Sequence, residues 1–141
     1  MIELRFITSR SIVSWLIRRL TWSDYSHVEF VLPYGYLGAQ ADGIKVRNFD
    51  YCKPTKAVIC HVDCPPEVTR IVLDYAKKQV GKPYDFMALV GGLFHRDWKK
   101  SNCWFCSELV AACFAYAGYP LIKGPVNRVT PGMLFNSILV K

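Results

Sequence analysis

The stretch that decides the fold reads NCWFCSELV and covers residues 102–110. It opens an apolar run that is closed by Gly118, a residue type that favours helix ends. The run predicts a helix over residues 103–117, the most apolar helix in the chain. Cys106 and Val110 share one side of that helix, so the Cys106 side chain is expected to point toward the elements on which the helix packs.

A cysteine near the start of a buried helix has a specific chemical use. The thiolate, and not the thiol, is the attacking species, and the partial positive charge of a helix N-terminus stabilises it. The free N–H groups of the first helical turn can also stabilise an oxyanion on a substrate. Cys106 is therefore a candidate nucleophile.

A candidate base stands at the start of a strand far upstream. The sequence YSHVEFV at residues 25–31 predicts a strand over residues 26–32, and it places His27 directly after a loop. If the helix that carries Cys106 packs against this strand, the thiol and the imidazole form a nucleophile–base pair.

Other cysteines and histidines compete for both roles. Cys113 lies deep in the predicted helix and Cys103 lies before its first turn, so both are less well placed for nucleophilic attack. His61 lies in a predicted strand between apolar neighbours, which favours a core position. His95 lies in a basic loop, which favours a surface position. The residue types alone also leave open a purely structural role for the candidate nucleophile and base.

The remaining chain predicts an α+β protein with a single domain over residues 1–141. The further predicted strands cover residues 3–8, 36–41, 44–49 and 57–62. The further predicted helices cover residues 12–21, 66–80, 84–94 and 131–139. A two-residue turn signal, Asp42-Gly43, predicts that two of these strands form a hairpin. The last predicted strand is rich in residues that favour strands, and we expect it in the interior of the sheet.

Composition narrows the class of protein. Hydrophobic residues make up 52% of the 141 residues and charged residues 21%, which excludes a disordered or low-complexity chain. The net charge of +7 comes from Lys and Arg that are scattered along the chain, so no nucleic-acid partner is expected. The charge predicts a solvated surface. Attraction to an acidic partner, such as an anionic lipid or a cell-wall polymer, is the alternative.

No segment predicts a membrane crossing or a secretory signal. The longest weakly charged stretch, residues 103–118, is too short to span a bilayer and contains Glu108. Charged residues interrupt the N-terminal residues 1–5, so no signal-peptide core is present and a cytoplasmic location is expected.

The six cysteines are expected to be free thiols, because the sequence predicts no export to an oxidising compartment. Two spacings, Cys60-x3-Cys64 and Cys103-x2-Cys106, are similar to those of zinc ligands. The second pair leads directly into the apolar helix and has no histidine near it in the sequence. We therefore expect no metal and no other cofactor.

Four short stretches, in this order and spacing, carry a resemblance to a known family. They read YSHV at residues 25–28, GKPYD at residues 81–85, FCSELV at residues 105–110 and VTPGML at residues 129–134. With them the sequence resembles the circularly permuted NlpC-like cysteine hydrolases, a branch of the papain-like superfamily related to lecithin-retinol acyltransferases. The resemblance implies a permuted papain-like fold, in which an antiparallel sheet packs against helices and the histidine strand precedes the cysteine helix.

The resemblance also implies an activity. Cys106 would attack a carbonyl carbon, His27 would accept and return the proton, and a thioacyl-enzyme would form. The implied substrate is an amide, such as a cell-wall peptide, which favours a bacterial or phage-encoded enzyme. Two alternatives remain open: a lipid acyltransferase or thioesterase with the same Cys–His pair, and a non-catalytic basic binding module.

The family has a third polar residue that orients the histidine. In this sequence the matching position is Gln40, where related sequences often carry Glu, so the chain departs from the family pattern. Asp42 and Glu29 are the alternatives for this role. Three aromatic residues are candidates for lining the substrate cleft: Tyr84, Trp104 and Phe105. Trp104 and Phe105 are expected to pack beside Cys106, and for Tyr84 the alternative is a structural role at the start of a helix.

Overall fold

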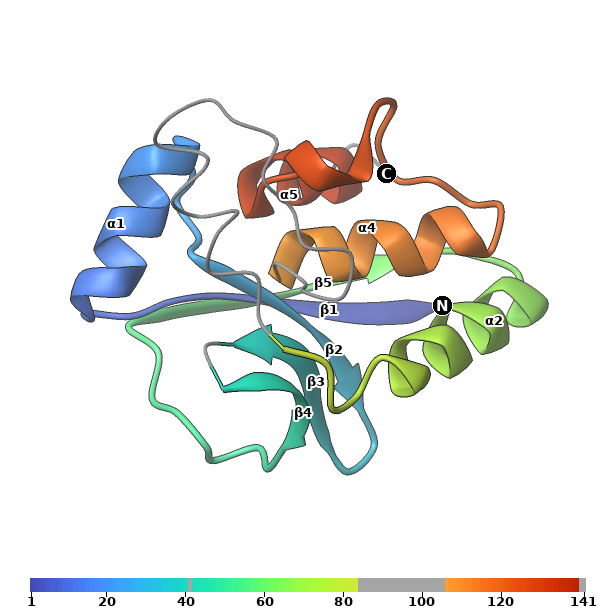
Figure 1. Cartoon of the computed structure of the whole chain (residues 1–141), viewed down its shortest axis with the longest axis horizontal. Coiled ribbons are helices and arrows are strands. Elements are labelled where there is room, and N and C mark those ends of the chain that lie inside the picture. The colour runs from blue at the N-terminus through green and yellow to red at the C-terminus, as the bar shows by residue number, and fades with distance from the viewer. Residues whose placement is uncertain (41, 84–105, 140–141) are drawn as a thin grey trace.

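The computed structural model describes residues 1–40, 42–83 and 106–139. Within this part of the chain the strands are β1 (Ile2–Thr8), β2 (His27–Leu32), β3 (Gly35–Gln40), β4 (Gly43–Arg47) and β5 (Lys56–Val62). These strands form one antiparallel sheet in the order β4-β3-β2-β1-β5 (Figure 1).

Helices pack on one face of the sheet (Figure 1). Helix α4 (Cys106–Tyr116) contacts β2 and β3, and α5 (Pro131–Leu139) contacts β5. Helix α2 (Pro66–Lys78) packs against the outer side of α4, and the short helix η1 (Val126–Arg128) also contacts α4. Helix α1 (Ile12–Thr21) connects β1 to β2 and lies at one end of the sheet.

The alternation of side chains along the central strands builds the core. Phe6 of β1 and Phe30 of β2 are fully buried on the helical side of the sheet. The rings of Phe30 and Phe114 of α4 stack with their centroids 6.4 Å apart. Full burial of one such side chain stabilises the fold by about 1.5–3 kcal/mol. Residues at the intervening positions, such as Glu29, point to the other side of the strand. Their side chains do not pack in this core and can take part in a functional site.

The sequence prediction of an α+β protein with an antiparallel sheet is confirmed in this coarse form. The predicted hairpin is also present, because β3 and β4 pair with Gln40 opposite Gly43. Gly43, which the sequence predicts as the second residue of the turn, is the first residue of β4, and its φ of 103° suits glycine. The predicted helix over residues 84–94 lies outside the described residues, as do residues 103–105 of the predicted cysteine helix. The permuted papain-like connection of these elements stays a prediction.

The expectation that residues 57–62 form an inner strand is wrong. Strand β5 pairs with β1 alone and is an edge strand among the described residues. One face of the strand is open to solvent, since Ile59 is 48% exposed. Residue types that favour strands indicate that a segment can form a strand, but they do not indicate whether that strand has one neighbouring strand or two.

Candidate active site

His27 occupies the first position of β2, where the strand leaves the loop that follows α1. The backbone N–H of Ser26 donates to the carbonyl oxygen of Ile7 at 3.0 Å. The Ser26 hydroxyl accepts a hydrogen bond from the Ser14 hydroxyl of α1 at 2.7 Å. Because both β1 and α1 hold the neighbouring residue, the backbone of His27 has a fixed position.

Glu29 lies two residues further along β2, on the same side of the strand as His27. Its Oε2 atom is 3.2 Å from Nε2 of His27. Its Oε1 atom accepts a hydrogen bond from the Arg5 guanidinium at 3.0 Å, and Arg5 lies directly opposite Glu29 on β1. The side chain of Glu29 is completely buried, and this pairing with Arg5 compensates the removal of a carboxylate from water.

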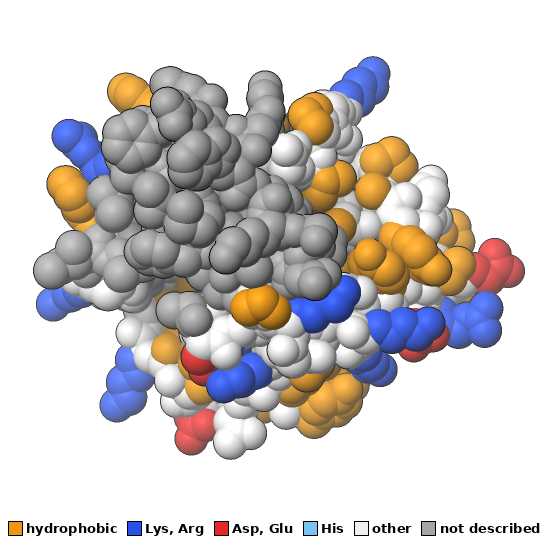
Figure 2. Space-filling model, viewed as in Figure 1, with side chains coloured by type: hydrophobic (Ala, Val, Ile, Leu, Met, Phe, Trp, Pro, Cys, Tyr) orange, Lys and Arg blue, Asp and Glu red, His pale blue; other side chains and the backbone are white. Residues whose placement is uncertain are grey.

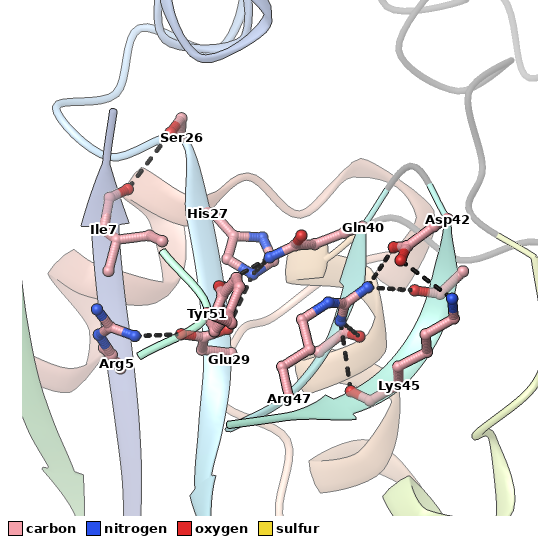
Figure 3. Close-up of polar contacts among 12 residues, drawn as sticks. Arg5, Ile7, Ser26, His27, Glu29, Gln40, Asp42, Lys45, Arg47 and Tyr51 are labelled. Atoms are coloured by element: carbon pink, nitrogen blue, oxygen red, sulfur yellow. Dashed lines mark hydrogen bonds and ion pairs between the residues drawn. The ribbon is translucent and has the colours of Figure 1, made fainter. Parts of the chain in front are cut away.

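Tyr51 connects Glu29 with Gln40. The phenol donates to Oε2 of Glu29 at 2.8 Å, and the Gln40 amide donates to the phenol oxygen at 2.7 Å (Figure 3). Nε2 of Gln40 is also 3.5 Å from Nε2 of His27. Burial, followed by the nearby Glu29 carboxylate, raises the pKa of Tyr51 above its usual range, so the phenol stays protonated and remains a donor.

Cys106 is the first residue of α4 as described, and its thiol interacts with the imidazole of His27. Burial lowers the pKa of His27, but the hydrogen bonds with Cys106 and Glu29, together with the charges of these two groups, raise it from 6.5 to about 9. The imidazolium form is therefore favoured in the folded protein. Its contribution to stability is complete below about pH 6.5 and is lost as the pH rises through about 9.

Gly38 of β3 leaves room for the imidazole ring of His27. A Cβ atom at this position would lie 3.0 Å from Cβ of Glu29 and 3.4 Å from Nε2 of His27. Any larger residue would push against both side chains, so the absence of a side chain at Gly38 lets the His27 ring lie over the neighbouring strand.

The structure does not bring Asp42 to the histidine. Its carboxylate pairs with Lys45 at 3.1 Å and with Arg47, and its side chain is 56% exposed (Figure 3). The hydrogen bond with Lys45 is the largest of the effects that lower the pKa of Asp42. Of the three candidates for the orienting role, Glu29 and Gln40 contact His27, and Asp42 closes the hairpin instead.

The competing candidates are less suited to catalysis. Burial raises the pKa of the Cys113 thiol well above its usual range, which leaves it protonated. The expected core position of His61 is wrong, because this residue is exposed on the edge strand β5 and lies 3.5 Å from Glu3. Five predicted residues lie outside the described part of the chain. They are Tyr84, His95, Cys103, Trp104 and Phe105.

The sequence did not reveal three residues of this network: Arg5, Gly38 and Tyr51. Arg5 carries the only available signal, since it is a charged residue in the middle of a strand that otherwise reads as apolar. Tyr51 lies in a loop, and nothing in the residues around it indicates a contact with β2.

No metal centre is formed by the residues in the described ranges, where no group of three or more His, Cys, Asp or Glu side chains could hold an ion. Cys64 of the first cysteine pair instead contacts the Thr69 hydroxyl at 3.3 Å. A pocket of about 330 Å³ lies elsewhere, between β5 and the loop after α4, and neither His27 nor Cys106 lines it. None of the helices in the described ranges is long and apolar enough to cross a membrane.

No protein-family model matches the sequence, and no curated protein matches it significantly. Among solved structures, the chain is similar to the crystal structure of the metalloprotein yiiX from Escherichia coli O157:H7, DUF1105. The two chains superpose with a TM-score of 0.74 and are 22% identical, and the match covers 95% of this chain and 90% of the other. At this identity the likeness shows a shared fold.

Proposed function

We propose that the protein is a cysteine hydrolase that cleaves an amide bond, with Cys106 as the nucleophile and His27 as the base. The observation that carries this proposal is the interaction of Cys106 with the imidazole of His27, whose Nε2 atom lies 3.2 Å from Glu29 and 3.5 Å from Gln40. A nucleophile, a base and a group that orients the base are the three parts that nucleophilic catalysis requires.

The contacts of the imidazole suggest how the proton moves. Glu29 and Gln40 both approach Nε2, which leaves Nδ1 as the nitrogen that exchanges a proton with the Cys106 thiol. The Glu29 carboxylate stabilises the positive charge that His27 gains when the thiol gives up its proton. The raised pKa of His27 agrees with this role, since it favours the imidazolium that accompanies a thiolate.

The reaction has two stages. In the first, the Cys106 thiolate forms a bond with the substrate carbonyl carbon, the C–N bond breaks, and the leaving amine takes a proton from the His27 imidazolium. In the second, His27 accepts a proton from water, the resulting hydroxide attacks the thioacyl carbon, and the acid leaves while the thiol is restored. The backbone N–H of Cys106 would hold the oxyanion in both stages.

The resemblance to the permuted NlpC-like hydrolases supports an amide substrate, such as a cell-wall peptide. The solved structure with the same fold is described as a metalloprotein, and this description applies to that protein. In the described part of this chain, the polar side chains around His27 form hydrogen bonds with one another, an arrangement that suits proton transfer.

A substrate panel tests the proposal. The protein is incubated with peptidoglycan fragments and γ-glutamyl amides in one arm, and with phospholipid vesicles as acyl donors in the other. Release of a new amine by mass spectrometry, together with a trapped thioacyl adduct on Cys106, supports amide hydrolysis. Acyl transfer from the lipid alone would replace the proposal with the acyltransferase alternative. A thiol that reacts no faster than a free cysteine would favour a binding module.

Variants of Glu29 and Gln40 distinguish the roles of these two residues in orienting His27. Glu29→Gln should lower kcat by about 10–100-fold, because the neutral amide no longer stabilises the imidazolium. It should also lower the pKa of His27, so the alkaline fall in activity moves to lower pH. Gln40→Ala should reduce kcat by only about 2–5-fold, since it removes the hydrogen bond that Gln40 donates to Tyr51 and leaves Glu29 in contact with His27. The pH profiles of kcat measure both effects.

Asp42→Asn is the matched control, because Asp42 is exposed and does not touch His27. Glu29→Gln also removes the charge partner of Arg5, so thermal melting checks that the variant is folded. If it is not folded, Tyr51→Phe replaces it, because this change removes one donor to Glu29 and leaves the ion pair with Arg5 intact. A larger loss in Gln40→Ala than in Glu29→Gln would assign the orienting role to Gln40.

A further inference from the structure

The outward face of α1 has an unusual composition. Trp15, Arg18, Arg19 and Trp22 follow the spacing i, i+3, i+4, i+7, which places them along one side of the helix and its C-cap. Trp15 is 54% exposed and Trp22 is 95% exposed. The guanidinium of Arg19 lies 5.7 Å from the centre of the Trp15 ring. Two indoles and the Arg19 guanidinium therefore share one solvent-facing side, whereas Arg18 beside them is partly buried and its Nε atom is shielded from water.

The opposite side of α1 faces the rest of the protein, and it includes a buried polar residue. Ser14 and Ile17 are 4% and 6% exposed, and the Ser14 hydroxyl is committed to Ser26. In an ordinary surface helix the large apolar residues face the core and the small polar residues face water. Helix α1 places the serine inside and the indoles outside, so the requirements of the fold do not explain the position of the two tryptophans.

The backbone conformation of Trp22 is unusual for a tryptophan. This residue is the C-cap of α1, and its φ of 51° and ψ of 42° place it in the left-handed region. Glycine or asparagine adopts this conformation readily, whereas a bulky side chain rarely does. The fold alone would favour one of these smaller residues. An almost fully exposed indole in a disfavoured conformation points to a partner outside the chain.

We propose that this face of α1 binds the surface of an anionic lipid bilayer. Indole rings favour the region of the lipid headgroups, and guanidinium groups form hydrogen bonds with phosphates. Helix α1 contains two arginines and no acidic residue, so its charge complements such a surface. In Figure 2, hydrophobic and basic side chains lie along the left edge of the molecule, where α1 stands in Figure 1. A projecting helix suits a flat, deformable surface, since contact with it requires no complementary groove.

Binding would bring the candidate active site close to the membrane. Ser14 of α1 holds Ser26, and Ser26 immediately precedes His27. The start of β2, with the base, would therefore lie on the inner side of α1, and the helix would stand between it and the bilayer. The binding itself needs no catalysis, so the proposal is independent of the chemistry assigned to Cys106.

Sedimentation with vesicles tests the proposal. The wild-type protein and Cys106→Ala should both bind vesicles that contain about 30% phosphatidylserine at least ~10-fold more tightly than pure phosphatidylcholine, and salt should weaken the binding. The double variant Trp22→Asn, Arg19→Gln should bind the anionic vesicles about 10–30-fold more weakly. Asparagine suits the left-handed conformation, so this variant should fold as the wild type does.

A matched control replaces an exposed aromatic residue and an exposed cation elsewhere. Tyr34→Asn, Lys78→Gln makes the same loss of one ring and one charge, in the β2–β3 turn and at the end of α2. It should bind as the wild type does. An equal loss in this control, or no binding of the wild type to anionic vesicles, would overturn the proposal. Sedimentation of the wild type as a dimer that the α1 variant dissociates would instead assign this face to a second copy of the chain.

Discussion

Replacement of Cys106 by alanine is expected to reduce kcat by about 10⁴-fold or more, because no other group in the described site can form the thioacyl bond. The fold should survive. Cys106 is 1% exposed, and the change removes one sulfur atom, which costs about 1 kcal/mol of stability. Steady-state kinetics on a cleaved amide and thermal melting measure the two effects.

A second readout of Cys106→Ala does not require a known substrate. The hydrogen bond with Cys106 and the charge of that group both raise the pKa of His27. Without them the pKa of His27 should fall below its value of about 9, toward or under its ordinary value. Titration of the histidine side-chain NMR signals measures this shift, and an unchanged His27 signal would show that the two residues do not interact in solution.

Cys113→Ala is the matched control, since it makes the same substitution in the same helix at a fully buried thiol. It should retain most of the activity, because burial keeps this thiol protonated. Loss of activity in Cys113→Ala, with Cys106→Ala fully active, would overturn the assignment of the nucleophile.

Local patterns of the sequence predicted the elements that carry the candidate pair. The apolar run after Cys106 predicted a buried helix, and the alternation after His27 predicted a strand, because both signals come from the neighbours of each residue. That helix and strand do contact each other in the fold. This contact followed from the need of both elements to bury their apolar sides, so it could be expected before the structure was known.

The surroundings of Glu29 could not be predicted in the same way. Arg5 and Tyr51 are 24 and 22 residues away from it, on a neighbouring strand and in a loop. Their contacts depend on strand register and on the path of that loop, and neither has a local signature. The same reason explains the wrong inner position of β5, because the order of strands is a property of pairing. The family resemblance implied Gln40 and left Glu29 as an alternative, and the closer contact of Glu29 with His27 emerged only from the geometry.

Replacement of His27 by alanine is expected to reduce kcat by about 10³-fold, which is the usual contribution of a general base. It should also change the reactivity of Cys106 toward iodoacetamide. In the wild-type protein the raised pKa of His27 keeps the imidazolium beside the sulfur up to about pH 9. A positive charge beside a sulfur is expected to increase its rate of alkylation at neutral pH. In the variant, alkylation at about pH 6 should slow by roughly 10-fold or more, and the rate should rise only in the alkaline range of an ordinary thiol, near pH 8.5.

His61→Ala is the control for this experiment, because His61 is exposed on β5 and pairs with Glu3, away from the site. Its alkylation profile should match that of the wild type. The double variant His27→Ala, Cys106→Ala should show only the slow background labelling of the other thiols, which identifies the sulfur that is measured. If His27→Ala kept the wild-type profile, the ionisation of Cys106 would not depend on the imidazole. The hydrogen bond between them would then be structural, and the base would have to be sought among other residues.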